Sequence, residues 1–508
     1  MEDRGGPART SARKVDTLDG PGPVAQRIEQ QPSNLSRVGS IPTRAATVSS
    51  RVSPGEDLAH RKVSRAAGSL STMSYVAPTP IARRPWWQRA LRNPWFWVLL
   101  ALVLISAACM IHTYVIVHAD TEVEQQGQKG VIPGITNQSL KLAFHYAWPT
   151  AAVWSAIFIF LDRFRTRHLH VWFLCFCWGA CVATWISMHV NTWMAGMLSV
   201  TGGVDPASGA GPAVYSAPFV EESCKALVLF ALAIGMGRRM TSVVQTVSMA
   251  GLSAIGFAFV ENIMYYARAD NYARVTASAG DPKQAVMELV LLRGVYASFG
   301  HPLFTSMTGI GLALGLRSRS RLVRIFAPTT GFVMAVVGHM LFNGFSSVLP
   351  MAILKKLWFV ALGIVASVVV FLVVRTVREG RMIRYRLEDY VKGGWLPNSD
   401  ADTLSALRRR QWAALVALSQ GPRRWWHTLE FLRVGTDLAY LRDAIVRGLD
   451  DDPGPRQIEL INRMNVLRPA AITVARGAKL SKPRLPAFLK RRRNQPVNNE
   501  LQWAPPQA

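Results

Sequence analysis

Charged residues are scarce in this chain of 508 residues: Asp, Glu, Lys and Arg make up 18% of it, against about a quarter in an average soluble protein. Half of the residues are apolar, and between positions 95 and 374 they form repeated blocks of about twenty, the length with which a helix crosses a bilayer core. This combination excludes a soluble globular enzyme. The sequence predicts an all-α polytopic membrane helix bundle.

Acidic residues are especially few, with 31 Asp and Glu against 58 Lys and Arg, so the formal net charge is +27. Much of the excess lies in the two ends of the chain and in the short segments between apolar blocks, where membrane proteins hold Lys and Arg for orientation. No base-reading module is present, so we expect no nucleic-acid partner. The basic segments are expected to meet anionic lipid headgroups.

Cysteine is also rare, and all five cysteines fall inside apolar blocks: Cys109, Cys175, Cys177, Cys181 and Cys224. They lack the paired spacing of a zinc site. We interpret them as small apolar residues at lipid or at helix contacts.

Aromatic residues are absent from positions 1–74, which are rich in Ser, Pro, Gly and Arg and cannot build a core. We therefore predict a disordered basic segment over 1–94. Residues 23–44 are similar to the translation of a transfer-RNA gene, which predicts a true start at Met73 and makes 1–72 a mis-assigned start. The alternative is a genuine disordered tail.

Eight apolar blocks follow and predict about eight transmembrane helices within a bundle domain at 95–376. Segments on one side of these blocks hold 18 Lys and Arg, and the longer segments on the other side hold 8, so both termini are predicted to be cytoplasmic. Residues 377–508, with 24 Lys and Arg against 13 Asp and Glu, are expected to form a basic cytoplasmic helical region with a disordered tail. The blocks are 95–117, 142–161, 171–198, 217–236, 243–266, 289–316, 326–349 and 357–374.

Ionisable residues inside four of these blocks are costly to bury, and each is a functional candidate for that reason. Glu221 lies one turn before Lys225, and His301 lies one turn before Thr305, so each pair shares a helix face. At 1.5 Å per residue, the four polar positions lie about 8 to 18 Å from the predicted outer ends of their helices, in the outer half of the membrane. The polar residues are Glu221, Glu222 and Lys225, then Glu261 and Asn262, then His301 and Thr305, then His339 and Asn343.

Carboxylates, imidazoles and an amide at one depth suit peptide-bond hydrolysis. A glutamate can act as the base for water, and an imidazole or the Asn343 amide can stabilise the oxyanion. His and Glu can equally hold a zinc ion that activates the water. The residues leave both possibilities open.

The order EExxK, FxxxEN, GHxxFT and HxxxN, over about residues 140–350, resembles the PrsW family of intramembrane proteases, a relative of the CAAX prenyl endopeptidases and the abortive-infection proteins. The resemblance implies cleavage of a single-pass membrane protein, such as an anti-sigma factor, near its extracytoplasmic end. It also implies a multi-pass protein of a bacterial plasma membrane. The expected catalytic residues are Glu221, Glu222, Lys225, Glu261, Asn262 and Asn343, and the expected ligands of a divalent metal, zinc, are Glu261, His301 and His339.

Other readings of the same residues remain. Glu and His inside a bundle also suit an ion- or proton-coupled transporter, although no related halves are visible. A non-catalytic scaffold would retain the Glu–Lys pairs for packing alone. Arg293 is expected to reach the interface or to pair with an acidic group, and the Gly311 and Gly315 pair predicts a close helix contact.

Overall fold

The computed structural model describes residues 86–125, 128–162, 164, 169–201, 214, 216–237, 240, 242–275, 281–449 and 454–478. The chain divides into two units, Met1–Arg83 and Arg84–Ala508. The first unit, and with it the predicted start at Met73, lies outside the described residues. Residues 86–91, at the end of the segment predicted to be disordered, form the short helix α2 (Trp86–Leu91).

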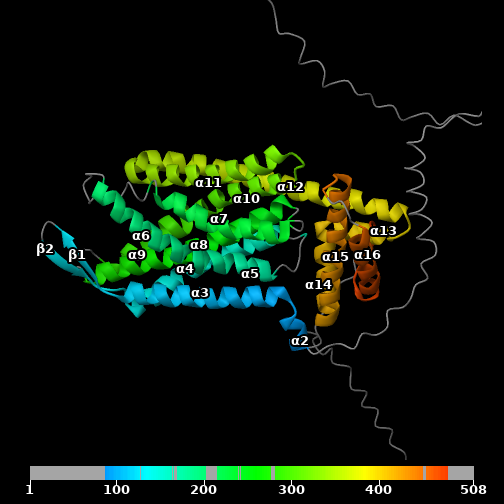
Figure 1. The fold of residues 1–508 in the computed structure, drawn as a ribbon, viewed down its shortest axis with the longest axis horizontal. Helices are drawn as coiled ribbons and strands as arrows, with labels where there is room; N and C mark the ends of the chain where they lie inside the picture. Colours follow the sequence, from blue (N-terminus) through cyan, green and yellow to red (C-terminus); the bar gives the residue numbers. More distant parts are fainter. Residues whose placement is uncertain are drawn as a thin grey trace, which may run out of the picture. The chain divides into compact units, whose positions relative to one another are not determined.

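Each of the eight apolar blocks is helical, the sixth with a break at 297–299 (Figure 1). Six of the described helical segments are long and apolar enough to cross a membrane, which confirms a multi-pass bundle. The other two predicted spans are α7, which carries three charged residues, and α10, which has only 17 residues. The helices are α3 (Pro94–His118), α4 (Asn137–Leu161), α5 (Leu169–Cys177) continued by η2 (Trp178–Ala183) and α6 (Thr184–Thr201), α7 (Ala217–Met236), α8 (Val243–Val275), α9 (Pro282–Leu289) continued by η6 (Val290–Tyr296), α10 (Gly300–Leu316), α11 (Arg321–Val348) and α12 (Met351–Lys392).

Helix α8 is the centre of the bundle and packs against α4, α5, α7 and α10 (Figure 1). Nearly all of its most apolar stretch is buried. A Cβ at Gly256 would overlap the carbonyl oxygen of Phe176, so only glycine allows α8 to lie this close to α5. The predicted close contact at Gly311 and Gly315 is confirmed, because a Cβ at either position would overlap α11.

One β-hairpin departs from the all-helical prediction. Strands β1 (Thr121–Gln125) and β2 (Gln128–Ile132) are antiparallel, with Thr121 opposite Ile132, and they connect α3 to α4. The predicted fold class remains correct for the bundle.

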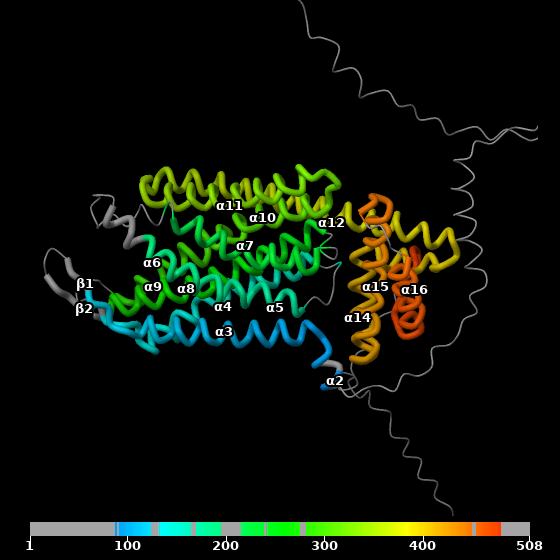
Figure 2. Tube along the Cα trace, in the orientation of Figure 1, coloured from blue at the N-terminus to red at the C-terminus, as the bar shows by residue number. Residues whose placement is uncertain are grey.

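The predicted boundary at 376 falls inside a helix, since α12 continues to Lys392 without a break (Figure 2). Four further helices pack around its C-terminal part and share a core that includes Leu387, Leu404, Phe431 and Met464. They are α13 (Asn398–Ser405), α14 (Leu407–Ser419), α15 (Pro422–Val446) and α16 (Gly454–Leu467), followed by a 3₁₀ turn, η7 (Arg468–Ala470). We call this group, with the end of α12, the C-terminal helical group. The predicted disordered tail beyond residue 478 lies outside the described residues.

Candidate active site

Four helices bring the polar residues singled out above into contact. Glu221, Glu222 and Lys225 lie on α7, Glu261 on α8, His301 near the start of α10, and His339 in α11. These side chains are separated by up to 118 positions along the chain, yet hydrogen bonds and ion pairs connect all of them. We call them, with Thr305, the polar cluster.

Lys225 lies in the middle of the polar cluster and is fully buried. Its Nζ lies 3.2 Å from Oε2 of Glu221, 3.0 Å from Oε1 of Glu222 and 2.8 Å from Nδ1 of His301. The ammonium group also lies 4.0 Å from the centroid of the Phe257 ring, a favourable cation–π distance. All three hydrogens of the ammonium therefore have acceptors, as the burial of a charge requires.

Glu222 is the most enclosed carboxylate of the polar cluster. Its Oε1 accepts hydrogen bonds from Lys225 and from Nδ1 of His339, at 3.0 and 3.2 Å. Its Oε2 accepts one from the Thr305 hydroxyl at 2.7 Å. Among the described residues, three donors thus reach a group with about four acceptor positions, which leaves one for another proton.

Three side chains of the polar cluster have the composition of a metal site. One ligand atom from each of Glu221, His301 and His339 lies within 4.8 Å of the other two. Nε2 of His339 lies 4.0 Å from Oε2 of Glu221. Two imidazoles and one carboxylate form a donor set that catalytic zinc uses with a fourth position left open. These residues therefore fit a zinc ion, and we call them the ligand trio.

Glu261 lies beside this trio rather than within it. Its Oε2 lies 2.9 Å from Nε2 of His301 and 2.8 Å from a guanidinium nitrogen of Arg293. The side chain of Asn262 is directed to the same arginine, because its Oδ1 accepts a hydrogen bond from Nε of Arg293 at 3.0 Å. Asn343 is half-buried one turn after His339, and its carbonyl accepts a hydrogen bond from Ser347.

A broken helix brings His301 to this place. The sixth apolar block is not one helix: α9 passes into the π-helical turn η6, the helix stops at 297–299, and α10 begins at Gly300. Pro302 is tolerated in the first turn of α10, where its missing N–H would have no partner. The break places His301 at a helix start and turns Arg293 toward α8.

The sequence indicated Arg293 only as a residue that pairs with an acid or reaches the interface. Its partner, Glu261, is 32 positions away, so no local spacing identified the pair. Phe257, whose ring faces Lys225, is the first residue of the FxxxEN motif but was given no role. Tyr265, whose ring faces Arg293, was missed, and its only signal is its place one turn after Glu261 on α8.

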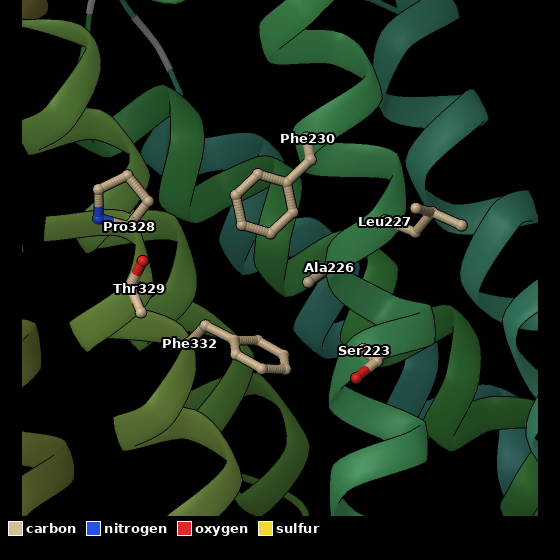
Figure 3. A pocket seen from close by; sticks show the side chains of 7 residues that line it. All are labelled: Ser223, Ala226, Leu227, Phe230, Pro328, Thr329 and Phe332. Carbon is tan, nitrogen blue, oxygen red and sulfur yellow. The ribbon is translucent and has the colours of Figure 1, made fainter. Parts of the chain in front are cut away.

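An apolar groove lies between α7 and α11, two of the helices that carry the polar cluster (Figure 3). Its cavity volume is about 250 Å³, and Ser223, the neighbour of Glu222, lines it. The hydroxyls of Ser223 and Thr329 donate to carbonyls of their own helices, so neither hydroxyl needs a partner from a molecule in the groove. The lining residues are Ser223, Ala226, Leu227, Phe230, Pro328, Thr329 and Phe332.

Residues 167–377 match the model of the family described as PrsW family intramembrane metalloprotease. This range contains every member of the polar cluster, and the match confirms the resemblance that the four motifs predicted. No curated protein and no solved structure matches the sequence. This part of the chain, which carries the whole polar cluster, is therefore similar to the PrsW family of intramembrane metalloproteases, and the match supports an intramembrane peptidase.

Proposed function

We propose that the ligand trio holds a divalent metal, zinc by the nature of its donors, and that the polar cluster hydrolyses a peptide bond beside it. The observation that carries this proposal is the meeting of Glu221, His301 and His339 within 4.8 Å inside a family of metalloproteases. When bound, such an ion lowers the pKa of a water molecule and withdraws charge from the substrate carbonyl. Glu261, which the sequence pointed to as a ligand, takes a supporting place in this proposal.

The proton transfers fall to Glu222 and Lys225. Glu222 has one acceptor position left and lies beside both His339 and Lys225, so we assign it as the general base. It accepts a proton from the water whose oxygen attacks the carbonyl carbon. As the carbon–nitrogen bond breaks, the same carboxyl group returns that proton to the leaving amine. Where Nδ1 of His301 is taken by a metal, the Lys225 hydrogen that now points to it would be released and donated to the oxyanion.

The substrate in this proposal is a membrane-anchored protein, anti-sigma-factor-like, that is cut near the extracytoplasmic face of a bacterial plasma membrane. The excess of Lys and Arg on one set of connecting segments supports this orientation. The same basic segments would contact anionic lipid headgroups. The site lies within the membrane-spanning helices, so the cut bond must itself enter the bundle.

The groove between α7 and α11 is the proposed path for the apolar segment of the substrate, because it has apolar walls and is lined by Ser223, which follows Glu222 in the sequence. Replacing the half-buried Ser223 by Phe would fill it. We expect a higher KM for a membrane-anchored substrate with kcat within about twofold of wild type. The matched control is Val333→Phe, at an exposed apolar position of α11 outside the groove lining. An unchanged KM for Ser223→Phe would contradict the path.

The function is tested with purified protein in nanodiscs and a single-pass substrate whose fragments are identified by mass spectrometry. We expect cleavage that a zinc chelator abolishes and that added zinc restores. Because Glu222→Gln keeps the side-chain volume but removes the base, it should lower kcat by about two to four orders of magnitude. Cleavage that survives both the chelator and Glu222→Gln would overturn the proposed site.

A further inference from the structure

We infer that Arg293 is a positioning residue that holds the Glu261 carboxylate against Nε2 of His301 and thereby directs Nδ1 of His301 into the ligand trio. The inference rests on the proposed function and assigns a role to a residue outside the four motifs. It also places Glu261 behind a ligand rather than among the ligands.

Three contacts fix the Arg293 side chain. A terminal nitrogen lies 2.8 Å from Oε2 of Glu261, Nε donates to Oδ1 of Asn262 at 3.0 Å, and the guanidinium carbon lies 3.9 Å from the centroid of the Tyr265 ring. An arginine that only reached for the membrane surface would not need these partners. The planar guanidinium group is thus held at two of its nitrogens and on one face.

The backbone around Arg293 is also held in place. Thr150 of α4 donates a hydrogen bond to the carbonyl of Gly294 at 3.0 Å. A Cβ at Gly294 would lie 3.0 Å from the hydroxyl of Tyr266, so glycine lets η6 approach α8 at this point. π-Helical turns such as η6 often occur at functional sites.

The position of Glu261 indicates which ring nitrogen of His301 carries the hydrogen. A carboxylate can only accept hydrogens, so we infer that the ring hydrogen is on Nε2 of His301, which lies 2.9 Å from Oε2 of Glu261. Nδ1 then has a lone pair, which in this structure accepts a hydrogen bond from the Lys225 ammonium 2.8 Å away and which a bound metal would take in its place. A histidine that ligates a metal usually donates its other ring hydrogen to a carboxylate or a carbonyl, and this contact fixes the ring orientation.

His339 has the same arrangement. Its Nδ1 contacts Glu222, and its Nε2 is the nitrogen nearer to Glu221. Glu222 in turn is paired with Lys225, as Glu261 is with Arg293. Each imidazole of the trio is therefore backed by a carboxylate, and each of these carboxylates by its own cation.

The experiment compares Arg293→Gln, Arg293→Lys and the matched control Arg274→Gln in the full-length protein. Arg274 pairs with Asp270 at 2.8 Å, both on α8, and among the described residues it contacts no member of the polar cluster. The readouts are the zinc affinity of metal-free protein, kcat and KM for a membrane-anchored substrate, and the melting temperature. Zinc affinity separates positioning of a ligand from a role in chemistry alone.

We expect Arg293→Gln to weaken zinc binding and lower kcat by about 10- to 100-fold each, the usual effect of losing an outer contact of a metal ligand, with KM within about twofold. Arg293→Lys keeps the charge but not the fork to Asn262, so it should recover part of both losses. Arg274→Gln should match wild type. Should Arg293→Gln fail to fold, Asn262→Ala, which removes one anchor of the arginine, is expected to lower both quantities by about fivefold.

If Arg293→Gln binds zinc and turns over substrate like wild type, this inference is overturned while the proposed function stays intact. The same holds for Asn262→Ala if Arg293→Gln does not fold. An unaltered zinc affinity with a reduced kcat would also overturn it, since Arg293 would then not act through His301. Failure of the wild-type protein to bind zinc or to cleave any substrate would instead contradict the proposed function.

Discussion

Two buried cations, Lys225 in the bundle and Arg410 in the C-terminal helical group, are surrounded in different ways. Lys225 contacts two carboxylates and an imidazole, all of which exchange protons. Arg410, 2% exposed, donates to the carbonyls of Phe164, Leu404 and Leu432 and to the Thr436 hydroxyl. Burial lowers the pKa of Arg410 to about 9, which leaves it charged at neutral pH.

The different partners of the two cations indicate different roles: Arg410 stabilises the fold, and Lys225 belongs to the proposed reaction site. Arg410 ties together backbone segments that are far apart in the sequence, because its acceptors belong to α13, α15 and the connection between α4 and α5. None of these acceptors titrates near neutral pH. Lys225 instead touches groups whose lone pairs can serve a metal, a water or a substrate. We expect substitutions in the two places to affect different measurements.

The largest expected effect is on cleavage, in His339→Asn and Glu221→Gln. Each removes a member of the ligand trio, so kcat should fall by about two to four orders of magnitude. Both replacements nearly conserve volume, and loss of a buried charge need not destabilise the fold, so the melting temperature should stay within a few degrees of wild type. Normal cleavage, or a collapse in melting temperature for every such variant, would show that these residues serve packing.

Arg410→Met should give the reverse result. Three buried carbonyls would lose a donor, at about 1 to 3 kcal/mol each, so the melting temperature in detergent should fall markedly. Molecules that remain folded should cleave within about twofold of the wild-type rate. The control is Arg408→Met, an exposed arginine of the same helix, which should melt like wild type. A lower kcat of Arg410→Met at a temperature where this variant is folded would contradict a purely structural role for Arg410.

Much of this organisation was predictable because the bilayer imposes it. Blocks of about twenty apolar residues gave the helices, and the cost of burying Glu221, His301 or His339 in them singled out the site. The hairpin at β1 and β2 was missed, since two five-residue strands carry little periodic signal. The break before α10 and the pairing of Arg293 with Glu261 depend on packing between helices, which no single segment encodes.

A smaller effect is expected for Thr305→Val. Its hydroxyl donates to Glu222 at 2.7 Å, and hydrogen bonds to charged groups contribute about 1.5 to 3 kcal/mol, so kcat should fall by about tenfold or somewhat more. Thr308→Val is the matched control one turn along α10: its hydroxyl is buried with no hydrogen-bond partner among the described residues. That variant should keep wild-type kcat and melt no lower. Equal effects of the two substitutions on kcat would contradict a specific role for Thr305.

The smallest effect should follow Asp443→Asn in the C-terminal helical group. Asp443 pairs with Arg386 at 3.1 Å and with Arg317, the residue after α10, at 3.5 Å. The Asp443 carboxylate is buried and also pairs with Arg447 at 2.9 Å, but Asn keeps an oxygen that can accept from these arginines, so the melting temperature should drop by only a few degrees. Asp389→Asn, whose partner Arg442 is more exposed, is the control and should change still less. A drop as large as that of Arg410→Met would mean that this pair, too, is a main structural support.

The unbroken course of α12 restricts where a binding partner can be. Forty-two residues in one helix extend about 63 Å, and the same helix begins among the spans and ends within the C-terminal helical group. A flexible tether would let that group sample many distances from the bilayer, whereas a continuous helix keeps its height above the lipid nearly constant. A protein bound to the C-terminal helical group would therefore lie at one distance from the membrane. A partner larger than the space between this group and the lipid surface would be excluded by its size.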